Sequence, residues 1–166
     1  ESYRRVRWGC HSKDWLNFRL TGTMATDYSD ASTATVEVRR REYYLPLFDR
    51  LGIGDKKNSM PPLFPSSHVV GTVNRQGARE SGIPQGTPVI AGALDAAAIA
   101  LGAGVLEEGD ACTVFGTCLA NEMLIGEEQL DFSQTCGSHL LSALPTGYLR
   151  MMGTTSGCGC LDWARR

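Results

Sequence analysis

The chain has 166 residues, a net charge of −2 and 42% hydrophobic residues, which is typical of a folded globular protein of about one domain. Its arginines cluster only in the segments 4–7 and 39–41, so the sequence offers no basic face for nucleic acid. No apolar run approaches the roughly 18 residues that a membrane span requires, and the N-terminus has no signal-peptide core. We therefore expect neither nucleic acid nor a membrane as a partner. Residues 39–41 most simply form a solvated turn, with polyanion binding as the alternative.

Cysteine and histidine usage bears on redox state and metal binding. The six cysteines form no dense framework, and several lie in apolar strand patterns where a thiol packs as a small hydrophobe. Cys158 and Cys160 form C-x-C, which lacks the spacing and the second pair of a zinc site. His11, His68 and His139 are far apart in sequence. We expect reduced thiols, no structural metal and a cytoplasmic location.

The N-terminal part begins with a predicted helix and a polar segment. Residues 13–20 have helical spacing, with Ser12 as N-cap and Thr21-Gly22 as the stop. Residues 26–31 are rich in hydroxyl and carboxylate side chains and predict a capped turn leading into a short helix. Contact with a substrate is the alternative for this segment. Three aromatic residues are expected in the core: Trp15, Phe18 and Trp163.

The next segments alternate between strand and helix. We expect a strand over 33–38, a helix over 42–51, a surface loop over 53–67 and a strand over 69–73. Asn74 is placed to cap a helix that runs through Ser81 and ends at Gly82. This order predicts α/β layers.

The centre of the chain places a carboxylate at a strand-to-helix edge. Residues 88–93 are apolar and predict a buried strand, and Asp95 follows where an alanine-rich helix begins. A strand over 112–115 ends at the Gly116–Cys118 turn, whose amides and hydroxyl could face an anion. Together these features suggest phosphoryl transfer. The structural alternatives are an N-cap role for Asp95 and a plain hairpin turn at Gly116-Thr117.

After Asp110 the character of the sequence changes. Strands are expected over 119–125 and 140–144, so a domain boundary near 104–110 follows. Residues 156–166 begin with small residues and end in a helical pattern. Gly157 and Gly159 would let a ligand or another backbone come close.

Three segments, 10–32, 82–110 and 113–118, resemble the FGGY carbohydrate kinases, a family that includes xylulokinase, ribulokinase, glycerol kinase and erythritol kinase. The run KDWLNFRLTG followed by TDYSDAS is the specific part of the likeness, and LDAAA at the helix start supports it. The order and spacing of the segments also match.

The resemblance implies an α/β, ribonuclease H-like, actin-like ATPase fold of two domains with the active site between them. Residues 1–108 would be the C-terminal part of the first, sugar-binding domain, and 109–166 the start of the second, nucleotide-binding domain. We therefore expect an internal piece of a longer enzyme that is inactive alone, because the Asp-x-Gly-Thr phosphate loop of the first domain is not within it.

The resemblance also implies the chemistry. It assigns Asp95 as the general base in ATP- and Mg2+-dependent phosphorylation of a ketopentose or polyol. Gly116 and Thr117 would contact the nucleotide phosphates. The adenine side would be formed by Gly157, Gly159 and Asp162. The expected partner is a small sugar or polyol, with a homodimer left open.

Three departures from the family pattern favour an alternative. Cys118 stands where serine is usual, Ala96 stands where many members carry a polar residue, and Gly157-Cys158-Gly159 replaces a Gly-Ser or Gly-Gly run. The alternative is a catalytically inactive relative that binds sugar or nucleotide as a regulatory module.

Overall fold

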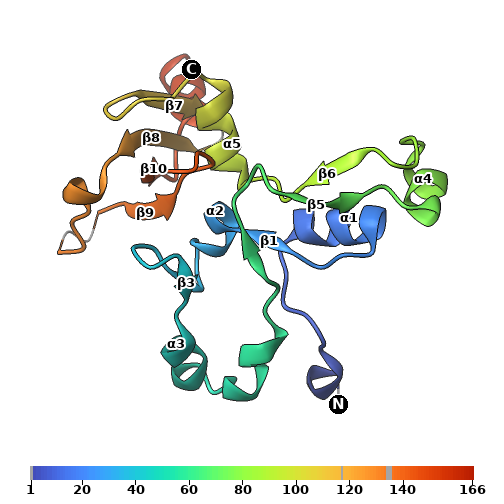
Figure 1. Ribbon diagram of the computed structural model, residues 1–166. Helices are drawn as coiled ribbons and strands as arrows, with labels where there is room; N and C mark the ends of the chain where they lie inside the picture. Colours follow the sequence, from blue (N-terminus) through green and yellow to red (C-terminus); the bar gives the residue numbers. More distant parts are fainter. Residues whose placement is uncertain (1, 117, 134–135) are drawn as a thin grey trace. The chain divides into compact units, whose positions relative to one another are not determined.

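The computed structural model describes residues 2–116, 118–133 and 136–166 and contains two compact units, residues 1–93 and residues 94–166 (Figure 1). We call them the N-terminal unit and the C-terminal unit. The boundary predicted at 108/109 concerns the domains of a longer protein and stays a prediction.

The N-terminal unit combines short strands with helices, as the α/β prediction requires. Its elements are η1 (Tyr3–Arg5), α1 (Ser12–Thr21), β1 (Thr26–Asp27), α2 (Tyr28–Ala31), β2 (Val36–Glu37), β3 (Glu42–Tyr43), α3 (Leu45–Arg50), η2 (Gly54–Ser59), β4 (Leu63–Phe64), β5 (Val69–Thr72), α4 (Arg75–Ser81) and β6 (Pro88–Ile90). Strand β1 pairs in parallel with β4, whereas β2 with β3 and β5 with β6 are antiparallel. Helix α1 packs against α4 and against the β5–β6 pair.

Helix α4 begins and ends at the residues that the sequence predicts. The Asn74 side chain accepts a hydrogen bond from the Gly77 amide at 2.8 Å, and Gly82 ends the helix with φ 79°. Helix α1 is also confirmed and ends at Gly22 with φ 82°. Its predicted N-cap is wrong, because His11 and not Ser12 precedes the first turn. The His11 backbone amide donates to Asp14 at 2.9 Å.

Three other predictions in this unit need correction. The strand expected over 33–38 is reduced to β2, because residues 32–35 form turns that follow the capped helix α2. The helix expected over 42–51 begins only at Leu45, since residues 42–43 pair with β2 as strand β3. The loop expected over 53–67 contains η2 and β4.

Two of the expected core aromatics lie at the surface. Trp15 is 49% exposed and Trp163 is 80% exposed, whereas Phe18 is half-buried. The one buried residue of α1 is Asp14, so the covered side of that helix carries a carboxylate and not an aromatic ring. Helix α6 (Cys158–Ala164) has no buried residue. The helical spacing predicted the helices correctly but not the side that is covered.

The C-terminal unit is a four-stranded antiparallel sheet with helices. Its elements are α5 (Asp95–Gly102), β7 (Ala111–Phe115), β8 (Leu119–Ile125), η3 (Glu127–Gln129), β9 (Ser138–Leu141), β10 (Tyr148–Thr154) and α6. The strand order is β7-β8-β10-β9. Strand β10 was not predicted, yet it pairs with both β8 and β9. The strand expected over 140–144 lies two to three residues earlier, as β9.

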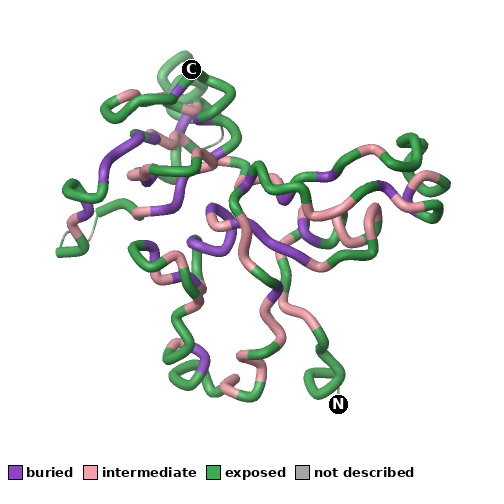
Figure 2. The backbone as a smooth tube through the Cα atoms, viewed as in Figure 1, coloured by how far each residue is buried: buried purple, intermediate pink, exposed green. Residues whose placement is uncertain are grey.

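Helix α5 packs on strand β8. Ala97 and Ala100 of α5 line the same small cavity as Leu124 of β8 and Leu149 of β10, and all four are buried. Figure 2 shows purple, buried segments in the strands of this unit. The small alanine side chains let the helix lie close to the sheet, which fixes where Asp95 stands.

Candidate active site

Asp95 occupies the first position of α5 and is exposed. The N-cap is Leu94, whose side chain caps nothing, so the capping alternative for Asp95 is not realised. The Asp95 carboxylate accepts a hydrogen bond from the Ala96 amide at 2.7 Å. A carboxylate in the first turn lies at the positive end of the helix dipole, which is a favourable position for a negative charge.

The N-terminal end of α5 lies toward the β7–β8 turn. The middle of α5 faces Leu124, and Glu122 lies two residues closer to that turn on the same face of β8. Asp95 and Glu122 are near enough to interact electrostatically. Asp95 therefore lies on the Glu122 side of Leu124 along strand β8.

Glu122 is a functional candidate that the sequence analysis missed. It is 2% exposed, and the Cys112 thiol lies 3.8 Å from its Oε2 atom across the β7–β8 pair. Burial raises the pKa of Glu122; the Cys112 hydrogen bond opposes this and the charge of Asp95 adds to it. The sequence contained a signal for Glu122. In the predicted strand 119–125, alternation puts Glu122 on the same face as Ala120 and Leu124.

Strands β7 and β8 are consecutive and pair antiparallel, with Gly116 and Cys118 at their facing ends. The Gly116 amide donates to the Cys118 carbonyl at 2.9 Å, and Phe115 pairs with Leu119. Strands β7 and β8 therefore pair as a hairpin up to Phe115 and Leu119, and the phosphate contact at Gly116 stays a prediction. Thr117, predicted to contact phosphate, lies outside the described residues.

Gly157 precedes α6 and lies directly against this hairpin. A Cβ atom on Gly157 would lie 2.6 Å from the Gly116 carbonyl oxygen and 2.7 Å from the carbonyl carbon of Cys118. The Cys158 amide donates to the same Gly116 oxygen at 2.9 Å. The fold thus brings together two glycines predicted for the nucleotide side, 41 positions apart in sequence.

The other two predicted residues of the adenine side lie within α6. A Cβ atom added to Gly159 would meet open space, because its nearest neighbour, Ser156 Oγ, would lie 4.0 Å away. Asp162 is exposed and lies 3.9 Å from the Arg165 guanidinium. Neither the neighbour of Gly159 nor the ion pair of Asp162 connects these residues to Gly116.

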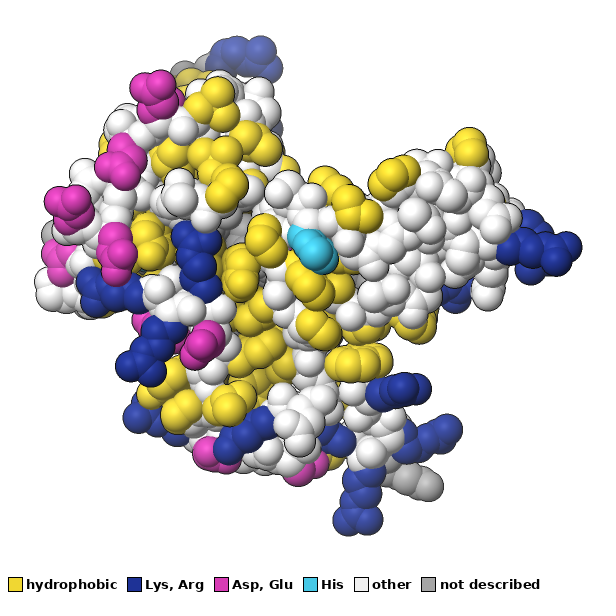
Figure 3. All heavy atoms as spheres, in the orientation of Figure 1, with side chains coloured by type: hydrophobic (Ala, Val, Ile, Leu, Met, Phe, Trp, Pro, Cys, Tyr) yellow, Lys and Arg dark blue, Asp and Glu magenta, His cyan; other side chains and the backbone are white. Residues whose placement is uncertain are grey.

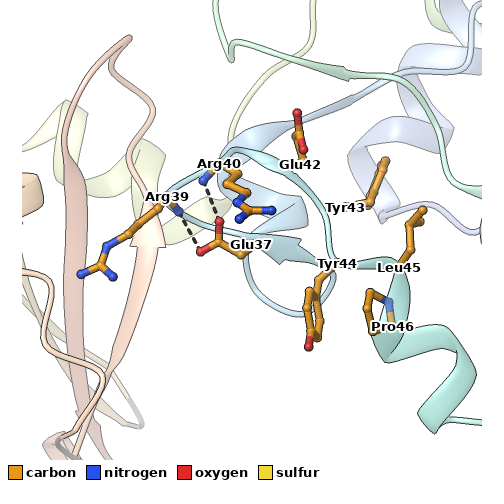
Figure 4. Close-up of a pocket in the computed structure, with 8 residues that line it drawn as sticks. All are labelled: Glu37, Arg39, Arg40, Glu42, Tyr43, Tyr44, Leu45 and Pro46. Atoms are coloured by element: carbon orange, nitrogen blue, oxygen red, sulfur yellow. Dashed lines mark hydrogen bonds between the residues drawn. The ribbon is translucent and has the colours of Figure 1, made fainter.

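Neither Asp95 nor Gly116 is among the residues that line the two larger hollows. One, of about 460 Å³, is in the C-terminal unit and is lined by Ala111, Cys112, Asn121, Glu122, Met123, Arg150 and Met152. The other, of about 610 Å³, lies in the N-terminal unit around the turn after β2 (Figure 4).

The second hollow contains the basic turn. The Glu37 carboxylate accepts hydrogen bonds from the Arg40 amide at 2.8 Å and the Arg39 amide at 3.3 Å, and Arg41 has φ 56°. The turn predicted over 39–41 is confirmed. On the face drawn in Figure 3, Lys and Arg side chains lie in separate groups, not in one basic surface.

An ionic network is buried in the N-terminal unit. The Lys13 ammonium lies 2.7 Å from Asp14, 2.8 Å from Asp27 and 3.5 Å from Asp30. Asp14 and Asp27 are fully buried. His11 Nδ1 lies 3.1 Å from Asp30. Burial lowers the pKa of Lys13, but its hydrogen bonds to Asp14 and Asp27 outweigh this and leave that pKa raised.

The same network shows what the polar segment 26–31 does. The Asp27 carboxylate accepts from the Ser29 amide at 2.8 Å and the Asp30 amide at 3.4 Å, so Asp27 caps α2 as predicted. It also accepts from the Ser66 hydroxyl at 2.8 Å. Asp30 faces His11 and Lys13, and burial raises the pKa of Asp30 against their opposing charge. These carboxylates hold α1, α2 and the segment after β4 together.

Metal binding and membrane insertion can be tested on the same residues. Across 2–116, 118–133 and 136–166, no group of three or more His, Cys, Asp or Glu side chains is arranged to hold a metal ion. The expected Mg2+ stays a prediction, because Mg2+ in proteins is usually held by one or two carboxylates together with substrate phosphates. Within those ranges, the helices are also too short or too polar to span a bilayer.

Comparison with known proteins identifies the family. Residues 1–102 match the N-terminal domain of the FGGY family of carbohydrate kinases. The erythritol kinase of Brucella abortus (strain 2308) is 37% identical over 109 residues, which are 64% of this chain and 21% of that enzyme. The xylulose kinase of Bacillus subtilis (strain 168) is 32% identical over 156 residues, which are 93% of this chain and 30% of that enzyme.

Solved structures agree with the sequence comparison. The crystal structure of a xyloylose kinase from Brucella ovis superposes with a TM-score of 0.85 at 28% identity, covering 97% of this chain and 33% of that one. The chain thus spans a third or less of the length of these three proteins and has part of the expected ribonuclease H-like, actin-like fold. It belongs to the FGGY family of carbohydrate kinases.

Proposed function

We propose that the protein containing this chain transfers the γ-phosphoryl group of ATP to a hydroxyl of a sugar or polyol, with Asp95 as general base. The observation that carries the proposal is the exposed Asp95 carboxylate at the first position of α5, in a chain of this family. A ketopentose or polyol is the proposed substrate class, because relatives are named xylulose kinase and erythritol kinase.

The chemistry requires a proton acceptor and careful positioning. A sugar hydroxyl becomes a competent nucleophile when a carboxylate within hydrogen-bond distance takes its proton. The oxygen then attacks the γ-phosphorus, the bond to the β-phosphate oxygen breaks, and ADP leaves. Asp95 has the exposure and the helix-terminal position that this role needs.

The nucleotide side is proposed for the segments that meet at Gly116 and Gly157. Their close backbone contact leaves no room for a side chain at Gly157. We keep Thr117, Gly159 and Asp162 as proposed members of this side. Mg2+ stays an expected cofactor of the reaction, and no residue of this chain is assigned to it.

The domain assignment is proposed in the same terms. Residues 1–108 would close the sugar-binding domain and 109–166 would open the nucleotide-binding domain. The cytoplasmic location and the homodimer stay predictions.

The second candidate is a regulatory relative that binds without turnover. The Cys118 thiol lies 3.9 Å from the Thr155 carbonyl, so the side chain that replaces the usual serine is engaged within the protein. Ala96 likewise supplies only its backbone amide near Asp95.

One experiment separates the two candidates. ADP release is measured for the full-length protein with ATP and a panel of ketopentoses and polyols, with calorimetric binding of each sugar and of ATP in parallel. Turnover of at least one substrate is expected. Saturable binding without turnover across the panel would favour the regulatory module, and neither binding nor turnover would contradict both.

A further inference from the structure

Two thiols from distant parts of the sequence lie against the same dipeptide. Cys118 Sγ is 3.9 Å from the Thr155 carbonyl oxygen, and Cys160 Sγ is 2.9 Å from Ser156 Oγ. Thr155 and Ser156 are adjacent, so the two sulfur atoms converge on one short segment between β10 and α6.

The backbone around these thiols is already held together. The Cys158 amide donates to Gly116, and the missing side chain of Gly157 lets the Cys118 carbonyl lie against the start of α6. Cys118 and Cys160 are both exposed, so a soluble oxidant can reach each sulfur atom. A disulfide requires Cα atoms within roughly 4.4–6.8 Å, so the proposed cross-link requires the hairpin and α6 to bring Cys118 and Cys160 to that separation.

We propose that Cys118 and Cys160 form a peroxide-sensitive thiol pair that cross-links the β7–β8 turn to α6. Cys118 comes from the hairpin and Cys160 from the helix, so their disulfide joins the two segments that we assign to the nucleotide. The cross-linking reaction stands on the thiol geometry alone, whereas its effect on ATP rests on the proposed function.

The reaction balances with a hydroperoxide as the oxidant. One thiolate attacks a peroxide oxygen, the O–O bond breaks, and a sulfenic acid and a water molecule form. The second thiol attacks that sulfur, the S–O bond breaks, and a second water molecule leaves as the disulfide forms. The two thiols thereby lose two electrons and two protons, and hydrogen peroxide is reduced to two molecules of water.

The disulfide would restrict movement between the β7–β8 hairpin and α6. A cross-link fixes Cys118, at the start of β8, against α6 and converts both thiols into one disulfide. If the β7–β8 turn binds ATP, the oxidised protein binds it more weakly, and bound ATP slows the oxidation.

Peptide mapping tests the pair in the full chain, without substrate. Trypsin leaves Cys118 on the peptide 80–150 and Cys160 on the peptide 151–165, because no Lys or Arg lies between Arg79 and Arg150. After treatment with hydrogen peroxide and non-reducing digestion, the two peptides are expected as one linked species that dithiothreitol separates. C118S and C160S should each reduce that species to background.

Matched variants exclude the neighbouring thiols. C158S and C112S should leave the linked species intact, because those cysteines lie on the same two peptides but outside the pair. Failure of the two peptides to link, or a link that survives C118S or C160S, would overturn the proposal. Protection of the thiols by ATP is then measured separately on full-length protein. Cross-linking at the same rate with and without ATP would count against the nucleotide site and not against the thiol pair.

Discussion

Gly157 and the Gly116 carbonyl oxygen are in such close contact that a Cβ on Gly157 would lie 2.6 Å from that oxygen. The hairpin that ends β7 and the helix that follows β10 are therefore joined through backbone alone. The Cys158 amide, 2.9 Å from the same oxygen, adds a hydrogen bond to this junction. The two segments proposed to contact the nucleotide form one structural piece.

Gly157→Ala should destabilise this junction. The added methyl group meets backbone atoms of Gly116 and Cys118 that cannot rotate away, and overpacking of this kind costs about 1–3 kcal/mol. Gly159→Ala is the control, because its Cβ has open space and alanine is the better helix former. Urea unfolding of both variants measures the difference. Equal stability of the two variants would show that the close contact is not maintained in solution.

The packing of α1 on α4 predicts a second glycine effect. A Cβ on Gly77 would meet the Leu20 backbone, 2.8 Å from its Cα atom and 2.9 Å from its carbonyl carbon. Although alanine usually favours a helix, Gly77→Ala should lower the free energy of unfolding by about 1–3 kcal/mol. Gly102→Ala in α5 meets no atom within 4 Å and should raise it by about 0.5–1 kcal/mol. A gain in stability from Gly77→Ala would refute the close approach of the two helices.

Lys13 should be the most costly charge to remove in the N-terminal unit. Lys13→Met leaves the buried carboxylates of Asp14 and Asp27 without their cation, and breaking a buried ion pair from one side costs about 3–5 kcal/mol. Lys57→Met breaks only the surface pair with Asp49, at 2.6 Å, and should change stability by less than about 1 kcal/mol. Thermal unfolding of both variants makes the comparison. Similar small losses would mean that the network contributes little.

Glu122 and Asp110 should give opposite pH dependences of stability. Because burial and Asp95 raise the folded-state pKa of Glu122 above its ordinary 4.5, the folded protein holds this proton more tightly than the unfolded chain. The ionised Glu122 carboxylate therefore destabilises the folded protein. This destabilisation is absent below the ordinary pKa of 4.5 and grows as the pH rises toward the folded-state pKa. Glu122→Gln should gain stability relative to wild type over this rise.

Asp110 provides the contrast. Hydrogen bonds from the amides of Glu107 and Leu106, at 2.9 and 3.0 Å, lower the pKa of Asp110 below its ordinary 3.8. Its stabilising contribution is present above that value and is lost as the pH falls through the folded pKa. Asp110→Asn should therefore lose most relative to wild type at neutral pH. The free energy of unfolding of both variants and of wild type is measured from about pH 3 to pH 8. Equal or reversed changes of the two variants with pH, relative to wild type, would contradict these assignments.

Local chemistry determined how much of the fold was predictable. Asn74 and Gly82 define α4 through their own side chain and backbone, so the sequence was sufficient there. Strand β10 was missed because its last three residues, Met-Gly-Thr, are exposed and do not alternate, and because its pairing with β8 and β9 depends on distant residues. Trp15 and Trp163 carry apolar rings whose burial depends on which elements cover the helix, which spacing alone does not specify.

The site was predictable to a similar degree. Asp95 was expected at a helix start and is there, because an alanine-rich segment follows it. The contact of Gly157 with Gly116 was not predicted, since it depends on how α6 folds back on the hairpin. Glu122 was overlooked because its burial follows from α5 covering that face of β8.

The most direct test of the central claim is the kcat of Asp95→Asn in the full-length protein, measured by ADP release with its best sugar or polyol. We predict a loss of about 10²–10⁴-fold, the usual contribution of a general base, with unchanged thermal unfolding. Asp49→Asn, an exposed carboxylate of the N-terminal unit, should keep the wild-type rate. A well-folded Asp95→Asn variant that also keeps the wild-type kcat would contradict the role of Asp95 as the base.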